Sequence, residues 1–378
     1  MNLRISPGGL PRGFSLSAAL ARPVALRPLA PSADRPGDAG ESVAIAGGAL
    51  RAGAFEVFLH GAEEVCVARA GLAALRDWAA AEGGGTQAAV ADALSALTAP
   101  RPPFAGLTLE TPRIVGIVNV TPDSFYDGGA HATRAAAIAH GEALVAAGAE
   151  MLDIGGESTR PGATAPDEAE EIDRVVPVIE ALAGQGVPIS ADTRRPAVMR
   201  AALAAGAAAI NDITALAAEG AVEAVTEAGA AAILMHMQGT PETMQRAPHY
   251  DHAPYEVFRF LEARAAACAA AGIPRARLCV DPGIGFGKTL AHNMAILASF
   301  ALFHGTGCAV MAGVSRKSFI AKILPGTKAE ERLPGSLAAT LAAVGQGAQL
   351  HRVHDAAETR QALAVWRAAL PREETGKT

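Results

Sequence analysis

An eightfold alternation of short apolar runs, polar junctions and helix-like segments is the feature that most restricts the fold of this sequence. After residue 111, each apolar run of four to eight residues leads into a polar or glycine-rich junction and then a segment of helical periodicity. The expected strands are 114–120, 151–154, 188–192, 208–213, 231–237, 278–281, 308–315 and 350–354. An open doubly wound sheet rarely repeats so evenly over about 260 residues. We therefore predict an α/β fold, a (β/α)8 TIM barrel, over residues 110–370.

The part of the chain before the barrel has a different pattern. Residues 1–40 are rich in Pro, Ser, Ala and Arg and contain no acidic residue before Asp34. That bias resembles a mitochondrial transit peptide, but frequent prolines disfavour its amphipathic helix, so we expect a flexible N-terminal tail or a start codon assigned too early. Alternating apolar runs and two helical patterns predict a small α+β module over residues 41–105, without chemically active side chains of its own.

Composition excludes several classes of partner. Hydrophobic residues make up 50% of the 378 residues and charged residues 19%, so a large core can form. No apolar run is long and uncharged enough to span a membrane, and a net charge of −6 without a polybasic run argues against nucleic acid. The four cysteines are scattered without CxxC spacing, which predicts buried, reduced thiols in a cytoplasmic protein.

Polar side chains gather where the expected strands end. In TIM-barrel enzymes this carboxyl edge carries the active site. Asn119 is the one polar residue of the first strand, and later junctions contribute Arg160, Asp192, Asn211, Met235, Asp281, Phe286, Lys317, Arg352 and His354. Alternate residues of a strand share a face, so Ser315 with Lys317, and Arg352 with His354, should converge on one ligand.

The chemistry of these side chains indicates what the ligand is. The cationic members imply an anion, whereas the Asp and Asn members imply a planar heterocycle with N–H donors and ring acceptors. The glycine-rich stretch 281–288 lacks the GxxxxGK[ST] spacing of a nucleotide-binding loop and is a weak signal alone. The set as a whole therefore predicts a heterocycle joined to an anionic group.

Seven motifs, in this order, resemble those of the dihydropteroate synthase family of folate biosynthesis: GIVNVTPDSF, GGESTRPGA, SADT, NDI, DPGIGFGK, GVSRKSF and RVHD. The resemblance covers residues 114–370 and leaves those before 106 outside. It implies a transferase that condenses 6-hydroxymethyl-7,8-dihydropterin pyrophosphate with p-aminobenzoate, giving 7,8-dihydropteroate and pyrophosphate, with Mg²⁺ as cofactor. It also implies a target of sulfonamides, and we expect a homodimer.

The resemblance implies roles for individual residues. The expected pterin contacts are Asp192, Asn211, Met235, Asp281, Phe286, Lys317 and Arg352. The expected pyrophosphate contacts are Asn119, Thr159, Arg160, Arg352 and His354, with Asn119 also holding Mg²⁺. The expected p-aminobenzoate pocket comprises Phe125, Thr159, Pro161 and Ser318. The expected catalytic residues are Arg160, Lys317, Arg352 and His354. Tyr126 stands where the family usually has a small residue, and this difference affects the expected shape of the entrance to the p-aminobenzoate pocket.

Other interpretations of the same residues stay open. No Ser-His-Asp, Cys-His or zinc arrangement appears at the strand ends, so catalysis would rest on positioning and charge stabilisation. A pterin- or folate-binding methyltransferase barrel would share the pterin contacts without needing an aminobenzoate pocket. A catalytically silent paralogue would only bind a pterin or a partner. Met235 and Phe286 could also be plain core residues, and His236 a structural histidine.

Overall fold

Eight parallel strands close into a barrel, as the repeat predicts. The computed structural model describes residues 2–33, 41–120, 129–157 and 165–370. The barrel strands are β7 (Arg113–Asn119), β8 (Met151–Gly155), β9 (Ile189–Asp192), β10 (Ala209–Asp212), β11 (Ala231–Met235), β12 (Leu278–Asp281), β13 (Ala309–Ala312) and β14 (Leu350–Val353). Hydrogen bonding of β14 to β7 and of β9 to β10 closes the ring, so the predicted TIM barrel is confirmed.

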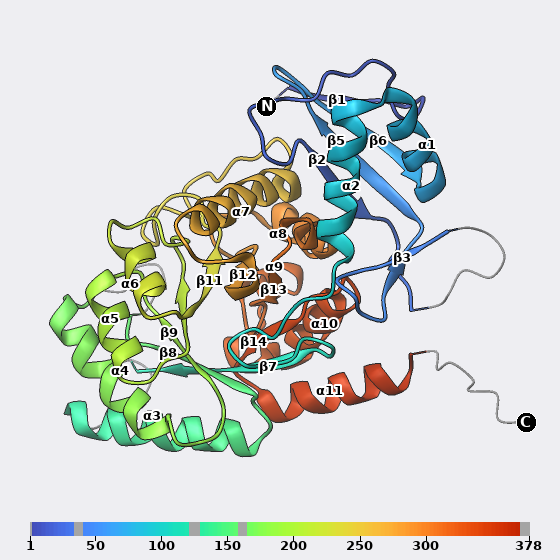
Figure 1. Cartoon of the computed structure of the whole chain (residues 1–378). Coiled ribbons are helices and arrows are strands. Elements are labelled where there is room, and N and C mark those ends of the chain that lie inside the picture. Colours follow the sequence, from blue (N-terminus) through green and yellow to red (C-terminus); the bar gives the residue numbers. More distant parts are fainter. Residues whose placement is uncertain (1, 34–40, 121–128, 158–164, 371–378) are drawn as a thin grey trace, which may run out of the picture.

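Helices surround the barrel (Figure 1). They are α3 (Gly129–Ala146), α4 (Glu168–Leu182), α5 (Pro196–Ala204), α6 (Ala221–Glu227), α7 (Ala253–Ala270), α8 (Leu290–Leu297), α9 (Ser318–Ile323), α10 (Leu333–Val344) and α11 (Ala356–Ala368). Local chemistry sets their starts: the Asp167 side chain accepts a hydrogen bond from the Glu170 backbone N–H, and Pro196 occupies the first turn of α5.

The two faces of the barrel strands carry different cores. Residues facing outward belong to a large cluster shared with the surrounding helices. Residues facing inward near the amino ends of the strands, including Val115, Met151, Ile233 and Leu350, form a separate apolar plug. This plug fills the barrel at the amino ends of the strands. Inward-facing polar groups are therefore expected at the carboxyl ends.

The N-terminal part folds as an α+β module with a four-stranded sheet. Its strands are β1 (Leu3–Ile5), β2 (Val24–Pro28), β5 (Ala54–His60) and β6 (Val65–Gly71), in the order β1-β6-β5-β2. The helices α1 (Leu72–Glu82) and α2 (Gly84–Thr98) cover one face, and the short strands β3 (Val43–Ala44) and β4 (Arg51–Ala52) form a separate pair.

The expectation of a flexible tail over residues 1–40 is wrong for its described part, because β1 and β2 belong to this sheet. Val24 and Leu26 are buried against α1 and α2, and residues 24–28 pair with β5 about thirty residues later. The sequence signal was weak because the run is short and lies between Pro23 and Pro28. Pairing with β5 stabilises β2, although the local sequence favours a strand only weakly.

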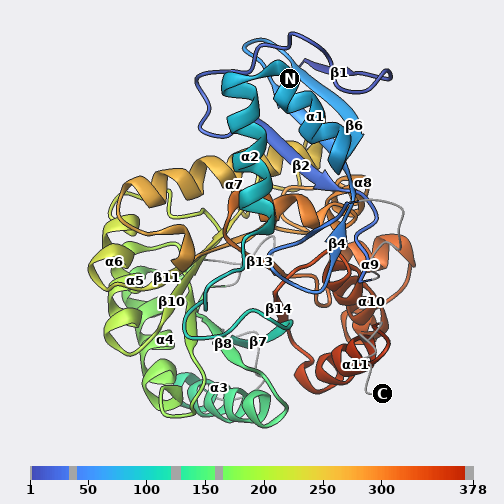
Figure 2. The same ribbon diagram turned by 45° about the vertical axis from the view of Figure 1, so that its right-hand side comes forward.

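The opposite face of this sheet packs on the barrel. Figures 1 and 2 show the module lying over α7. Phe58 of β5 belongs to the same core cluster as Tyr255 and Phe258 of α7. Arg22 donates a hydrogen bond to the Gly305 carbonyl at 2.8 Å, in the 3-10 helix η3 (Phe300–Thr306). The module is therefore a third layer on the barrel.

Among the described residues, no helix combines the length and hydrophobicity needed to cross a membrane. The four cysteines are buried and unbridged.

Candidate active site

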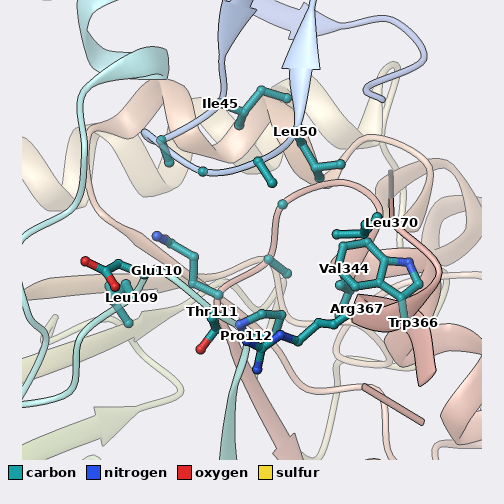
Figure 3. A pocket seen from close by; sticks show the side chains of 16 residues that line it. Ile45, Leu50, Leu109, Glu110, Thr111, Pro112, Val344, Trp366, Arg367 and Leu370 are labelled. Atoms are coloured by element: carbon teal, nitrogen blue, oxygen red, sulfur yellow. The ribbon is translucent and has the colours of Figure 1, made fainter. Parts of the chain in front are cut away.

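A cavity opens between the module, the linker to the barrel and α11, with about 750 Å³ of space that no atom fills (Figure 3). Ile45, Leu50, Trp366 and Leu370 supply its apolar wall. The cavity lies at the amino ends of the strands, because Pro112 and Gln349, which precede β7 and β14, also line it. It is thus at the opposite end of the barrel from the predicted polar residues.

A group of polar side chains lies at the carboxyl ends of the strands. Register pairs Asp153 with Ser190, and Asn211 with Asp192, across β8, β9 and β10. Arg352 of β14 reaches across to both carboxylates: its Nε lies 2.5 Å from Asp153 Oδ2, and an Nη lies 2.8 Å from Asp192 Oδ2. Residues that are 160 and 199 positions apart in the chain thus meet at one edge.

Asp153 is the centre of this group, and the sequence analysis overlooked it. It is fully buried and accepts hydrogen bonds from Ser190 Oγ at 2.5 Å, Asn211 Nδ2 at 3.0 Å and Arg352. A signal was present, because Asp153 is the one charged residue in the apolar strand β8. A buried carboxylate needs partners, so a lone Asp in a buried strand already predicts a polar cluster around it.

Burial and charge act in opposite directions on these groups. The pKa of Asp192 is raised to about 7, because burial and the neighbouring Asp153 together outweigh the opposing effect of Arg352. Burial disfavours the Arg352 charge, but Asp153 and Asp192 outweigh it and raise the pKa of Arg352. The guanidinium is therefore held charged beside a carboxyl group that can exchange a proton near neutral pH.

A second group comes from β12 and the segment after β13. Asp281 is buried, its Oδ1 accepts a hydrogen bond from the Gly283 N–H at 2.7 Å, and burial raises its pKa although Lys317 opposes this. Lys317 donates to the Ile284 carbonyl, and its Nζ lies 4.5 Å from the centroid of the Phe286 ring. Burial lowers the pKa of Lys317 to about 8, so its ammonium form persists at neutral pH.

Other predicted residues lie at the same edge. Met235 ends β11 and is buried, whereas Phe286 is only half-buried. His354 follows β14, and its Nδ1 lies 3.0 Å from Ser315 Oγ. Asn119 ends β7 and is half-buried. Ser318 is exposed at the start of α9.

Four predicted residues lie outside the described part of the chain: Phe125, Thr159, Arg160 and Pro161. The same holds for Tyr126. The described geometry of the site is therefore that of the predicted pterin contacts, together with Asn119, Ser318 and His354.

An ion-pair network supports the strand ends behind Asp192. Glu157 accepts a hydrogen bond from Arg194 at 2.8 Å and lies 3.7 Å from Arg195, which also pairs with the fully buried Glu171. Burial raises the pKa of Glu171, while Thr193 and Arg195 oppose the rise. The sequence analysis did not identify this network, because its members come from three separate segments.

The described edge combines carboxylates, an amide, an ammonium and a guanidinium around two apolar side chains. Carboxylate and amide oxygens can accept from a heterocycle's N–H groups, while the cations can face an anion. Within residues 2–33, 41–120, 129–157 and 165–370, no cluster of three or more His, Cys, Asp or Glu could hold a metal ion. Asn119 offers one neutral oxygen, which suits a Mg²⁺ that takes its other ligands from phosphate and water.

Known proteins are similar to this chain in sequence and in fold. The family model described as pterin binding enzyme matches residues 115–354. The dihydropteroate synthase of Escherichia coli K12 is 48% identical over 269 residues, covering 71% of this chain and 95% of the relative.

Solved structures agree with that match. The Xanthomonas albilineans dihydropteroate synthase with 4-aminobenzoic acid has 52% identity and a TM-score of 0.68, covering 72% of this chain and all of that chain. The same enzyme in complex with 7,8-dihydropteroate has 49% identity and a TM-score of 0.65 at the same coverage. The Yersinia pestis enzyme with a sulfonamide drug complex has 46% identity and a TM-score of 0.66, covering 69% of this chain and 95% of that chain.

Proposed function

The chain belongs to the dihydropteroate synthase family of folate biosynthesis, and on that premise we propose how its own residues carry out the reaction. The reaction condenses 6-hydroxymethyl-7,8-dihydropterin pyrophosphate with p-aminobenzoate and releases pyrophosphate. The observation that carries the proposal is the meeting of Asp153, Asp192, Asn211 and Arg352 at one end of the barrel, with Asp281 and Lys317 at the same edge.

The pterin ring takes the described edge. Asp192, Asn211 and Asp281 accept from or donate to the polar edge of the heterocycle, while Lys317 donates to a ring acceptor. Met235 and Phe286 pack on the ring faces, and the Arg352 guanidinium stacks on one of them. The support is geometric: Asp281 and Lys317 face each other across Gly313, where a Cβ atom would lie 3.3 Å from the carboxylate and 3.7 Å from the ammonium.

The pyrophosphate takes the cationic side of the same edge. Arg352 belongs to β14, His354 directly follows that strand, and Asn119 ends the neighbouring strand β7. We propose that Thr159 and Arg160 complete this site, and that Phe125, Thr159, Pro161 and Ser318 form the p-aminobenzoate pocket. Asn119 would help to hold Mg²⁺, which would neutralise charge that builds up on the leaving group.

The reaction then needs little acid-base chemistry from the protein. The C–O bond between the pterin methylene and pyrophosphate breaks, and the dihydropterin ring stabilises the cation left on the methylene. The neutral arylamine nitrogen of p-aminobenzoate forms the new C–N bond and releases a proton to solvent. Arg160, Arg352 and His354 stabilise the departing pyrophosphate, while Lys317 and the carboxylates hold the pterin in line.

One assay tests the proposal against its alternatives. Purified protein is incubated with the pterin pyrophosphate, Mg²⁺ and labelled p-aminobenzoate, and labelled 7,8-dihydropteroate is measured. Product formation is expected; binding of the pterin without product would support the silent paralogue. A folate-dependent methyl transfer without product would support the methyltransferase barrel. A parallel titration with EDTA tests the proposed need for Mg²⁺.

Lys317→Ala is expected to weaken pterin pyrophosphate binding by about 1.5 to 3 kcal/mol, the usual contribution of a hydrogen bond to a charged group. Calorimetric titration measures the change, and circular dichroism checks that the fold is retained. Lys322→Ala changes an exposed lysine of α9, the short helix that begins after Lys317; it is the matched control and should bind as the wild type does. A wild-type dissociation constant for Lys317→Ala would remove Lys317 from the site.

Pterin affinity should fall as pH rises past about 8. Burial lowers the pKa of Lys317 to about 8, so the ammonium donor is present below that pH and is lost above it. The dissociation constant is measured from pH 6.5 to 9 and is expected to increase above pH 8, beyond the range around pH 7 in which Asp192 titrates. Lys317→Arg, which remains charged throughout this range, should remove the increase even if its affinity is lower. A level wild-type profile up to pH 9 contradicts the assignment.

We also propose a cytoplasmic homodimer that sulfonamides inhibit. Four buried, unbridged cysteines support a reducing compartment. The exposed apolar residues Ile323, Leu324 and Val365 support an interface near the C-terminal helices. Light scattering tests the dimer, and competition of a sulfonamide with p-aminobenzoate tests the inhibition.

A further inference from the structure

A buried lysine behind the pterin site ties two loops together. The Lys288 side chain is almost fully buried, which lowers its pKa, and its Nζ lies within hydrogen-bond distance of the His236 carbonyl at 3.2 Å, the Phe286 carbonyl at 2.9 Å and His236 Nδ1 at 3.0 Å. Lys288 Nζ thus has three polar partners on two loops. Lys288 joins the segment after Met235 to the backbone of Phe286, the two residues assigned to the ring faces of the pterin.

The same two segments approach each other too closely for side chains. A Cβ atom at Gly283 would lie 2.0 Å from the His236 carbonyl oxygen, and one at Gly287 would lie 2.6 Å from the Gln238 carbonyl oxygen. Both glycines have positive φ angles, 67° and 58°. A displacement of residues 236–238 therefore cannot be absorbed locally and must move residues 283–288.

Tyr250 connects these loops to the start of α7. Its hydroxyl donates to the Gly287 carbonyl at 2.9 Å, and its ring lies 6.0 Å from that of His236. Two residues later, the His252 ring caps α7 by accepting a hydrogen bond from the Tyr255 N–H. The segment that leads into α7 therefore contacts the loop that carries Phe286.

The N-terminal module holds this start of α7 from the other side. The Phe58 ring stacks on Tyr255 at 4.6 Å and meets His252 edge-on at 5.2 Å. His60, at the end of the same strand β5, has its Nδ1 2.8 Å from the Tyr255 hydroxyl. Phe58 is fully buried in this contact.

We propose that the N-terminal module is a positioning element of the pterin site. Through Phe58 and His60 it fixes the start of α7, and through Tyr250 and Lys288 that position fixes the loop carrying Phe286. None of these four residues is among the substrate contacts proposed above. The inference rests on the proposed function, because it takes Met235 and Phe286 as the pterin wall.

Two variants of one strand separate positioning from stability. Phe58→Leu removes the ring that faces α7, whereas Phe55→Leu, its matched control, removes an equally buried ring that faces α1 and α2. Both are expected to lower the melting temperature. Only Phe58→Leu should raise the dissociation constant for pterin pyrophosphate, by about threefold to thirtyfold, the range for residues that act on a site through packed neighbours.

Two further variants keep the test open if Phe58→Leu does not fold. His60→Leu, at a half-buried position, removes the partner of the Tyr255 hydroxyl, and Tyr250→Phe removes the bond to Gly287 alone. Each should raise the same constant. Equal pterin affinity in wild type, Phe58→Leu and His60→Leu overturns the inference, as does an equal loss in Phe55→Leu. A wild-type protein that does not bind the pterin refutes the proposed function, and the inference with it.

Discussion

Replacing Asp153 with leucine is expected to destabilise the folded protein by about 3 kcal/mol or more, the low end of the loss when one partner of a buried ion pair is removed. Asp153 is fully buried and is the common acceptor for Ser190, Asn211 and Arg352. Leucine leaves all three donors facing an apolar side chain, and of its two ion pairs among the described residues Arg352 keeps the one with Asp192. Urea unfolding, followed by circular dichroism, gives the free energy.

Two further variants show whether the charge is responsible. Asp153→Asn keeps the size and one acceptor oxygen, so it should lie between wild type and Asp153→Leu. Ser190→Ala removes the hydroxyl that donates to Asp153 and, at 3.4 Å, to the Leu152 carbonyl, and should lower stability by about 1 kcal/mol. If Asp153→Leu unfolds within about 1 kcal/mol of wild type, Asp153 is not the centre of a stabilising network.

Deleting residues 1–105 is expected to leave a barrel that is insoluble or unfolded at 25 °C. The deletion uncovers the Tyr255 ring and the side of η3 around Ala301, which belongs to the module's core cluster. It also removes Arg22 and Arg101, which donate to backbone carbonyls of residues 304, 305 and 308. Each large side chain uncovered loses about 1.5 to 3 kcal/mol, and several such losses approach the whole stability of a typical domain.

Solubility and thermal unfolding of the truncated protein measure this effect directly. A second truncation that begins at residue 23 keeps β2, β5 and β6, and it should retain most of the stability. A protein lacking residues 1–105 that is soluble and melts at the wild-type temperature contradicts the view that the module is a layer of the barrel.

The barrel itself was predictable from the sequence because its signals are local. Leu278–Asp281 is both the predicted strand and β12, since an apolar run ends there at Pro282, which has no N–H to continue the ladder. The strand expected over 308–315 is shorter, Ala309–Ala312. Its alternating pattern continues to Ser315, but Gly313 already lies close to the Asp281 carboxylate, and the chain turns there.

Part of the candidate site was predictable for the same reason. Residues such as Asp192, Asp281, Lys317 and Arg352 lie at junctions that any (β/α)8 pattern brings to one edge. Asp153 was not identified, because it lies one layer deeper, inside a strand that looks uniformly apolar except for this residue. Which donors it serves depends on the register between β8, β9 and β10.

By itself, the sequence determined the succession of strands and helices, the edge at which the predicted site residues gather and the family, because periodicity and motifs are properties of short segments. Only the tertiary structure decided the network around Asp153 and the role of residues 2–33. Arg352 pairs with Asp153 and Asp192, which lie 199 and 160 positions away in the chain. Likewise, β2 pairs with a strand about thirty residues later. Such contacts depend on closure of the sheets, and no local pattern encodes their partners.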